Sequence, residues 1–286
     1  MNCIVCRSNN TRFYLKKNGY FLYKCADCGL VFVSPLPREV GAIYDEKYFC
    51  GANKQFGYAD YDKDKMPMKN VFLKYLKIIA GNFETVKGKK LLDIGAATGF
   101  FARIAQDFGF NAEGIEISKW AAQEGRKKGL KIHHGTVDTI QFLENSFDVI
   151  TLFDVLEHIS EPDKFLEKIF LILKQDGVLV INTPDAKSVW SRILGRRWQA
   201  YIPPEHLILY NKNNIEFFLK RHKFKILKIK TIGKSFTLSY IFHILHSSFK
   251  FSFFQKLSSF FNKDFFNKIS IPLNVRDSMF ITAKKN

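Results

Sequence analysis

The stretch "KKLLDIGAATGFFARIAQDFGFNAEGIEIS", residues 89–118, decides the fold. It alternates an apolar strand, a glycine-bearing turn, a helix and a second strand that ends in an acid. Further along, a helix is expected over 162–177, and strands are expected over 177–184, 224–232 and 277–285. Because alternating strands and helices predict a parallel sheet with helices on both faces, we expect an α/β fold.

The glycine spacing in this turn excludes two common nucleotide-binding patterns. A dinucleotide fingerprint that begins at Gly95 would need its next glycines where Ala97 and Phe100 stand. The P-loop pattern fails as well, because no Gly-Lys-Ser/Thr follows. Small residues here let the backbone approach a ligand closely without building a phosphate cradle. Glu116 ends the second strand, where a carboxylate can accept hydrogen bonds from both hydroxyls of a ribose.

The pattern Asp93-x-Gly95-x-Ala97-x-Gly99 resembles motif I of class I S-adenosylmethionine (SAM)-dependent methyltransferases, with Ala in place of the middle glycine. The resemblance implies a Rossmann-like, seven-stranded class I methyltransferase sheet over residues 89–286, with SAM as cofactor. It assigns cofactor binding to Asp93, Gly95, Ala97, Gly99, Glu116, Ile117, Asp138, Phe153 and Asp154. The alternative interpretation is that Asp93 and Glu116 only cap strands and helices.

The segment "FDVLEHI", residues 153–159, resembles the matching segment of methyltransferases related to ubiquinone-biosynthesis O-methyltransferases. The Asn/Asp-Pro-Pro-Tyr motif that receives a flipped base is absent, which weighs against base amines as acceptors. In some relatives the corresponding residues hold a divalent cation. Asp154, Glu157 and His158 would share one helical face and are the candidate ligands here. The alternative is that Glu157 and His158 cap the helix and line the cleft.

The segment "RRWQAYIPPEHLILYN", residues 196–211, follows the fifth strand at the sheet edge where acceptors dock in this fold. It resembles a W-x-x-x-x-P-P-E-H-L motif of bacterial methyltransferases that join an N-terminal zinc ribbon to a SAM domain, many of them in surface-polysaccharide pathways. His206 is the candidate general base, because transfer to an alcohol oxygen gains from a base near neutral pH. Glu205 can orient that imidazole or bind a sugar hydroxyl, and His158 completes the predicted catalytic set. The alternative is that His206 hydrogen-bonds a backbone carbonyl and shapes the loop.

Four of the five cysteines form the pattern C-x2-C-x18-C-x2-C, at Cys3, Cys6, Cys25 and Cys28. Two Cys-x-x-Cys turns can aim four thiolates at one tetrahedral zinc ion. A disulfide would fit a secreted protein, and a redox pair needs a single such turn before a helix. We therefore expect a zinc ribbon with structural zinc over residues 1–35, followed by a connector and helices over 36–88. Cys50 is expected to be a lone thiol.

The net charge of +17 is concentrated, since residues 188–275 hold 15 Lys/Arg and 3 Asp/Glu, or 15 − 3 = +12. Basic segments favour anionic partners such as nucleic acid or an acidic membrane leaflet, and a plain solvated surface is the alternative. Residues 236–272 are expected to form a Phe-rich helical insertion, buried as core or exposed as a lid for a lipid-linked acceptor. No secretory signal and no apolar run of about 18 residues is visible. We expect a cytoplasmic protein, with peripheral contact at the inner face of the membrane if the insertion is such a lid.

These features predict a SAM-dependent methyltransferase that O-methylates a sugar, nucleotide sugar, lipid-linked glycan or related small molecule in surface-polysaccharide biosynthesis. The alternative enzyme is a ribosomal or transfer RNA methyltransferase that uses the ribbon for RNA recognition, which the positive charge favours. The motif around His206 weighs against it. A third alternative is a zinc-ribbon interaction protein with a degenerate SAM fold, against which the acids at Asp93 and Glu116 argue.

Overall fold

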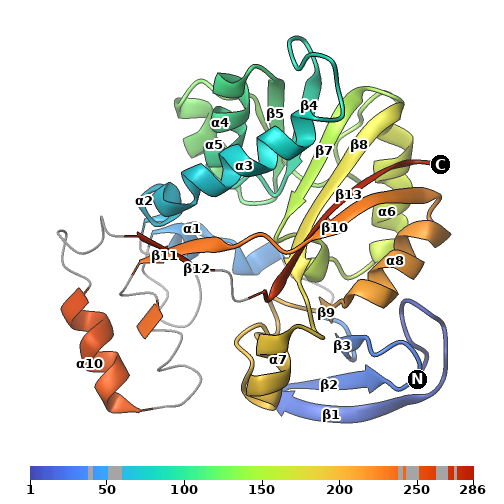
Figure 1. The fold of residues 1–286 in the computed structure, drawn as a ribbon, viewed down its shortest axis with the longest axis vertical. Helices are drawn as coiled ribbons and strands as arrows, with labels where there is room; N and C mark the ends of the chain where they lie inside the picture. The colour runs from blue at the N-terminus through green and yellow to red at the C-terminus, as the bar shows by residue number, and fades with distance from the viewer. Residues whose placement is uncertain (38–40, 51–59, 238–240, 243–250, 262–269, 274–275) are drawn as a thin grey trace.

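The computed structural model describes residues 1–37, 41–50, 60–237, 241–242, 251–261, 270–273 and 276–286. Its centre is a seven-stranded sheet in the order β10-β13-β8-β7-β4-β5-β6 (Figure 1). The strands are β4 (Lys90–Ile94), β5 (Asn111–Glu116), β6 (Ile132–His134), β7 (Phe147–Phe153), β8 (Leu173–Pro184), β10 (Phe224–Lys230) and β13 (Ser278–Lys285). Neighbouring strands are parallel, except that β13 runs antiparallel to β8 and β10. The Rossmann-like, seven-stranded α/β fold expected from the sequence is confirmed.

The central strands are apolar on both faces because successive side chains point to opposite sides of a sheet. The covering helices are α3 (Lys69–Ala80), α4 (Phe100–Phe108), α5 (Lys119–Lys127), α6 (Pro162–Ile172) and α8 (Lys212–Arg221). Leu91 and Val149 lie in the core shared with α3 and α4. Leu92 and Ile150, one position further along the same strands, lie in the core shared with α6 and α8. This two-sided burial explains why these strands read as continuous apolar runs.

The N-terminal ribbon forms a second sheet in the order β1-β2-β3-β9. Its strands are β1 (Thr11–Lys17), β2 (Tyr20–Cys25), β3 (Val31–Val33) and β9 (Ile208–Leu209). The first three come from the expected ribbon, whereas β9 comes from the segment 196–211, a pairing that the sequence did not predict. Leu22 and Val31 of the ribbon belong to the same buried cluster as Leu92 and Ile150. The ribbon and the large sheet therefore share one core.

The helix expected over 162–177 is shorter than predicted. Helix α6 ends at Ile172, and Leu173 already has extended backbone angles of φ −75° and ψ 136°. Leu173 pairs with Phe147 of β7, so it begins β8. The expected C-terminal boundary was wrong because that strand pairing is a tertiary contact, invisible to the local helical pattern of "FLEKIFLILK".

Several short helical elements connect the strands and longer helices. They are η1 (Gly41–Ile43), α1 (Glu46–Phe49), α2 (Tyr61–Lys65), η2 (Met66–Met68), η3 (Leu156–His158), α7 (Val189–Leu194) and η4 (Gly195–Arg197). In the expected insertion, β11 (Lys234–Thr237) pairs with β12 (Ser270–Leu273), and α10 spans Ser252–Phe261. Much of the Phe-rich insertion expected over 236–272, namely residues 238–240, 243–250 and 262–269, lies outside the described residues. Across the described ranges, no helix combines the length and apolar character that crossing a membrane requires.

Candidate functional site

The turn after β4 is built for close backbone approach. Gly95, Ala97 and Gly99 all have left-handed backbone angles, with φ of 75°, 49° and 80°. A Cβ on Gly95 would lie 2.6 Å from Val155 Cγ2, and one on Gly99 would lie 2.3 Å from Leu130 Cδ1. The left-handed backbone favours glycine at both positions, and an added Cβ would also have to displace the side chain of Val155 or Leu130. The middle position tolerates Ala, whose left-handed backbone costs about 1 kcal/mol or more.

Glu116 ties this turn to the next one. Its side chain is 5% exposed, and its two carboxylate oxygens accept hydrogen bonds from the backbone N–H groups of Ala97 (2.7 Å) and Ser118 (2.8 Å). Burial raises the pKa of Glu116, and the backbone donors oppose that rise. Each carboxylate oxygen has a second lone pair for a ligand hydroxyl. The strand end that was predicted to hold a ribose thus carries a buried, oriented acceptor.

Asp93 is a second buried acid at this edge. It accepts a hydrogen bond from Thr151 Oγ1 at 2.6 Å. Burial raises the pKa of Asp93 to about 7, with the charge of Glu116 adding to the rise. In the described part of the chain, neither Asp93 nor Glu116 has a cationic side chain within ion-pair distance. Two buried acids without a cationic partner suit a positively charged ligand. A ligand that carries a sulfonium and an ammonium group therefore fits them better than a negatively charged pyrophosphate.

The remaining predicted cofactor residues differ in their surroundings. Ile117 is 41% exposed beside η1, and Asp138 lies exposed on the loop after β6. The Phe153 ring packs against the aromatic rings of Phe72 and Phe101, so its side chain serves the core beneath the cleft. Asp154 has φ of 55° and accepts a hydrogen bond from Asn182 Nδ2 at 2.8 Å. Their cofactor contacts stay predictions.

Two histidines from distant parts of the chain meet at the same edge. The ring centroids of His158 and His206 lie 4.8 Å apart at an interplanar angle of 78°. His206 Nδ1 lies 2.7 Å from the carbonyl oxygen of Ala200. That carbonyl only accepts, so Nδ1 carries the proton and Nε2 is the basic nitrogen of the neutral ring. The loop-shaping contact foreseen for His206 therefore coexists with a nitrogen able to take a proton.

His158 is held by contacts on one ring nitrogen. Its Nδ1 lies 2.9 Å from Tyr44 Oη and 2.8 Å from the carbonyl oxygen of Glu205. Burial lowers the pKa of His158 to about 4, so the ring is neutral at pH 7. The predicted catalytic role of His158 stays a prediction.

Glu205 is buried beside the two histidines. Burial raises the pKa of Glu205 to about 7, and a long hydrogen bond of 3.5 Å from Tyr48 Oη opposes the rise. The side chain can therefore hold or release a proton near neutral pH. Tyr44 and Tyr48 were not among the predicted site residues, and they reach the site from the segment "YDEKYF". The clustering of tyrosines in that segment was the available sequence clue.

The candidate cation ligands are only partly brought together. Glu157, His158 and His206 each offer an atom within 4.8 Å of the others, whereas Asp154 bonds Asn182 instead. Glu157 is fully buried and accepts a hydrogen bond from Thr183 Oγ1 at 3.0 Å. The three residues Leu156–His158 form a 3-10 turn, so the α-helical spacing assumed for the set does not apply.

An aromatic cover lies over the turn after β4. Phe49 packs with Ala97 and Ala121 and stacks on Trp120 at a centroid distance of 5.8 Å. On the α5 side of the turn there is a cavity of about 290 Å³. It is lined by Phe49, Cys50, Asp60, Tyr61, Asp62, Thr98, Trp120, Glu124 and Lys128. The lining touches the turn only through Thr98 and contains none of the predicted site residues, so the cavity neighbours the site without containing it.

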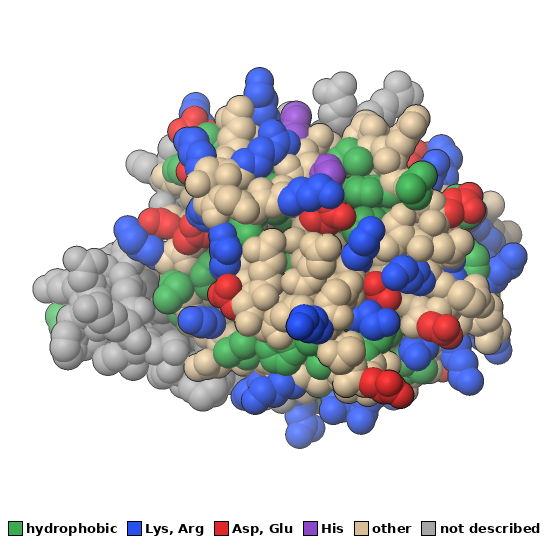
Figure 2. All heavy atoms as spheres, turned by 90° about the horizontal axis from the view of Figure 1, so that it is seen from above, with side chains coloured by type: hydrophobic (Ala, Val, Ile, Leu, Met, Phe, Trp, Pro, Cys, Tyr) green, Lys and Arg blue, Asp and Glu red, His purple; other side chains and the backbone are tan. Residues whose placement is uncertain are grey.

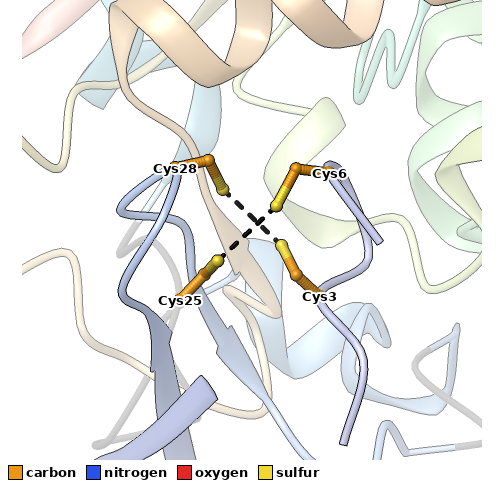
Figure 3. Close-up of side chains that lie close together, drawn as sticks. All are labelled: Cys3, Cys6, Cys25 and Cys28. Atoms are coloured by element: carbon orange, nitrogen blue, oxygen red, sulfur yellow. Dashed lines mark hydrogen bonds between the residues drawn. The ribbon is translucent and has the colours of Figure 1, made fainter. Parts of the chain in front are cut away.

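The four ribbon cysteines converge (Figure 3). The Sγ atoms of Cys3 and Cys28 lie 3.6 Å apart, and those of Cys6 and Cys25 lie 3.5 Å apart. Tetrahedral Zn–S bonds of about 2.3 Å would place sulfurs about 3.8 Å apart, whereas a disulfide requires about 2.0 Å. The residues present therefore fit a zinc ion. Cys50 is exposed and stands outside the cluster, as expected.

This chain is similar in sequence to known methyltransferases. A family described as "Methyltransferase domain" matches residues 69–229, which is more than half of the 286 residues. The chain is 32% identical over 105 residues to the mitochondrial ubiquinone biosynthesis O-methyltransferase of Schizosaccharomyces pombe, covering 34% of this chain and 38% of that protein. It is 29% identical over 146 residues to the ubiquinone biosynthesis O-methyltransferase of Glaesserella parasuis, covering 46% and 60%. The chain thus spans only part of the length of these relatives.

A solved structure confirms the fold. The crystal structure of a SAM-dependent methyltransferase from Archaeoglobus fulgidus aligns with a TM-score of 0.55 and 19% identity, over 83% of this chain and 99% of that one. At this identity the likeness concerns the fold alone. The region that matches the methyltransferase family, residues 69–229, includes the turn after β4, the end of β5, and both His158 and His206.

Proposed function

This chain belongs to the methyltransferase domain family, and we propose that it transfers the methyl group of SAM to a hydroxyl oxygen of a sugar or related small molecule. The observation that carries the proposal is the meeting of His206, His158 and Glu205 at the carboxyl edge of the sheet, next to the motif I turn. Acceptors in open α/β sheets dock at this edge. The relatives named as O-methyltransferases support oxygen as the methylated atom.

The donor would be held by the two buried acids and the turn between them. SAM supplies a methyl group on a positively charged sulfur. Asp93 lacks a described cationic partner, so it would face the positive end of the donor, directly or through water. Glu116 would accept from the ribose hydroxyls with its remaining lone pairs. Gly95, which is exposed, would let the methionine end approach the backbone.

His206 would act as the general base. An alcohol has a pKa far above neutral, so its oxygen becomes a good nucleophile only as its proton leaves. The Nδ1–H group bonded to the Ala200 carbonyl leaves Nε2 as the proton acceptor of the neutral ring. His158 and the backbone of Glu205 would fix the orientation of the loop. Correct alignment of oxygen, methyl carbon and sulfur contributes as well, because methyl transfer is an in-line displacement.

The acceptor would carry hydroxyl groups. Glu205, with Tyr48 beside it, places an acid of pKa about 7 next to the candidate base, an arrangement that can donate to or accept from a sugar hydroxyl. The resemblance of the 196–211 segment to methyltransferases of surface-polysaccharide pathways supports a sugar, nucleotide sugar or lipid-linked glycan.

The surface of α7 supports an acceptor anchored in an anionic membrane. Val189 and Ile193 are 53% and 68% exposed one helical turn apart, and Arg192, Arg196 and Arg197 are exposed around them. Apolar tips ringed by arginines suit the interface of an anionic leaflet. Helix α7 precedes the segment that carries Glu205 and His206, and it lies beside the ribbon strands (Figure 1).

Vesicle flotation tests the membrane contact. The protein should float with anionic vesicles and not with zwitterionic ones, and Ile193→Glu should abolish flotation. Leu143→Glu is the matched control, since Leu143 is 84% exposed on the loop between β6 and β7. Equal behaviour of the two variants would remove the membrane contact from the proposal.

Transfer of label from SAM tests the reaction itself. Purified protein should methylate a member of a panel of nucleotide sugars and lipid-linked glycans, and His206→Gln should lower the rate by about a hundredfold or more while leaving binding of S-adenosylhomocysteine intact. Label entering RNA, with a steep dependence on salt, would instead establish the RNA methyltransferase. On the face drawn in Figure 2, Lys and Arg lie interspersed with Asp and Glu, which does not favour an extended RNA-binding patch.

A further inference from the structure

We infer that the N-terminal ribbon is the scaffold that positions His206, because β3 of the ribbon pairs with β9 of the acceptor loop. The inference rests on the proposed function and assigns the ribbon a role within it. The acceptor loop is defined here as residues 198–210, and the ribbon as residues 1–35. Val33 and Leu207 are the positioning residues of this arrangement.

The pairing between ribbon and loop is a regular antiparallel ladder. Val31 pairs with Leu209 and Phe32 pairs with Ile208. The backbone N–H of Val33 donates to the carbonyl oxygen of Leu207 at 2.8 Å. All of these side chains are at most 2% exposed, so the contact is dry and fully packed. Buried backbone groups need partners, and the loop finds its partners in the ribbon.

Leu207 also forms a hydrogen bond with η3, on the side of the loop away from β3. The backbone N–H of Leu207 donates to the carbonyl oxygen of Glu157 at 2.8 Å. Leu207 therefore bridges β3 on one side and η3 on the other, and His206 is the adjacent residue. A shift of β3 would move the imidazole relative to His158. Misplacing a catalytic group by about 1 Å can cost about a hundredfold in rate.

The second cysteine knuckle holds the end of the loop directly. The carbonyl oxygen of Cys28, a predicted zinc ligand, accepts hydrogen bonds from Asn211 Nδ2 (3.1 Å) and Asn214 Nδ2 (3.4 Å). Asn211 is fully buried and also caps the N-terminus of α8. The knuckle therefore helps to fix the position of Asn211, the residue that follows the loop.

The β1–β2 hairpin holds the start of the loop. Asn18 Nδ2 donates to the carbonyl oxygen of Pro203 at 2.9 Å. The Tyr14 ring packs edge-on against Tyr201 at a centroid distance of 5.7 Å. Ribbon contacts therefore occur near the start, in the middle and just beyond the end of the loop. Four thiolates held by one zinc ion would fix the two knuckles, so loss of the metal is expected to loosen the ribbon even though it shares the core of the large sheet.

Hydrogen exchange of the full chain tests the inference without needing an acceptor. Zinc-loaded protein is compared with protein stripped by a chelator, with zinc content measured in both. Exchange in residues 205–211 should rise about tenfold or more on stripping, since several hydrogen bonds are lost, while exchange in residues 90–94 stays unchanged. Unchanged exchange in 205–211 after verified loss of zinc would overturn the inference.

A backbone variant separates the strand pairing from the metal. Val33→Pro removes the one N–H that bonds Leu207 and leaves all four cysteines in place. We expect one zinc per chain and about fivefold faster exchange at 205–211, whereas Val33→Ala keeps the N–H and the slow exchange. Equal exchange in the two variants would contradict the inference. Calorimetry with S-adenosylhomocysteine on the zinc-loaded protein is run in parallel, since a failure to bind there refutes the proposed function rather than the ribbon's role.

Discussion

Replacing Asp93 by Asn should stabilise the fold and, at the same time, weaken the binding of SAM, the methyl donor. The Asp93 carboxyl is buried, bonds only a neutral hydroxyl among the described residues, and stands near the negative charge of Glu116. Asparagine has nearly the same shape, and its oxygen can still accept from Thr151. The substitution therefore removes a poorly compensated charge and keeps the packing. Such opposition between stability and ligand binding is typical of functional sites.

The size of the effect follows from the raised pKa. The Asp93 pKa is about 7 in the fold against an ordinary 3.8, and the difference of 7 − 3.8 = 3.2 pH units corresponds to about 4 kcal/mol at full ionisation. Between these two pH values the folded carboxyl keeps a proton that the unfolded chain has released. Stability is therefore lost as the pH rises toward 7 and stays lost above it. From pH 5 to pH 8 the wild type should lose about 3 kcal/mol that the variant keeps.

Urea unfolding at pH 5 and pH 8 measures this difference. Relative to wild type, Asp93→Asn should gain about 3 kcal/mol more at pH 8 than at pH 5. Asp148→Asn is the control, because Asp148 is also buried but bonds Lys174 and Lys89. Burial alone would raise the pKa of Asp148, and these cations hold it below its ordinary value, so its neutralisation should destabilise. An Asp93→Asn variant that gains nothing extra at pH 8 would refute the reasoning.

Three further predictions concern the candidate methyl-transfer site and the cluster of four cysteines. Glu116→Gln should weaken S-adenosylhomocysteine binding about tenfold or more in calorimetry, because one of two backbone donors and the ribose hydroxyls lose an acceptor. His206→Gln should lower the rate of methyl transfer by about a hundredfold to ten-thousandfold and flatten its pH profile, with donor binding unchanged. Cys3→Ser should lower the zinc content and the melting temperature, measured by metal analysis and calorimetry, because three remaining thiolates hold the metal less tightly.

Each of these variants has a matched control. Glu113 lies on the same strand as Glu116 but bonds Lys131 and His133, so Glu113→Gln should leave donor binding intact. His133→Gln should leave the rate of transfer intact, since His133 lies on β6 outside the histidine pair. Cys50→Ser should leave the zinc content intact. Effects of equal size in variant and control would contradict the assigned role in each case.

Local sequence patterns predicted the strands of the sheet. These strands are buried on both faces, so they appear as continuous apolar runs that end at glycines or acidic residues. The turn of residues 95–99 was readable because its left-handed backbone needs small residues. The end of α6 was misjudged because Leu173 follows the helical pattern but pairs with Phe147. The contact between Tyr44 and His158 was not predicted, because it spans more than a hundred residues and leaves no periodic trace in the sequence.

The sequence by itself determined the chemistry available to this protein: two acids and small residues around a turn, two histidines and a glutamate, and four cysteines at metal-ligand spacing. Only the tertiary structure decided which of these groups meet. His158 and His206 face each other, and β9 pairs with β3, because the loop before α8 is packed between the ribbon and η3. Residue types and short spacings are local properties, whereas contacts between distant segments arise from the packing of a shared core.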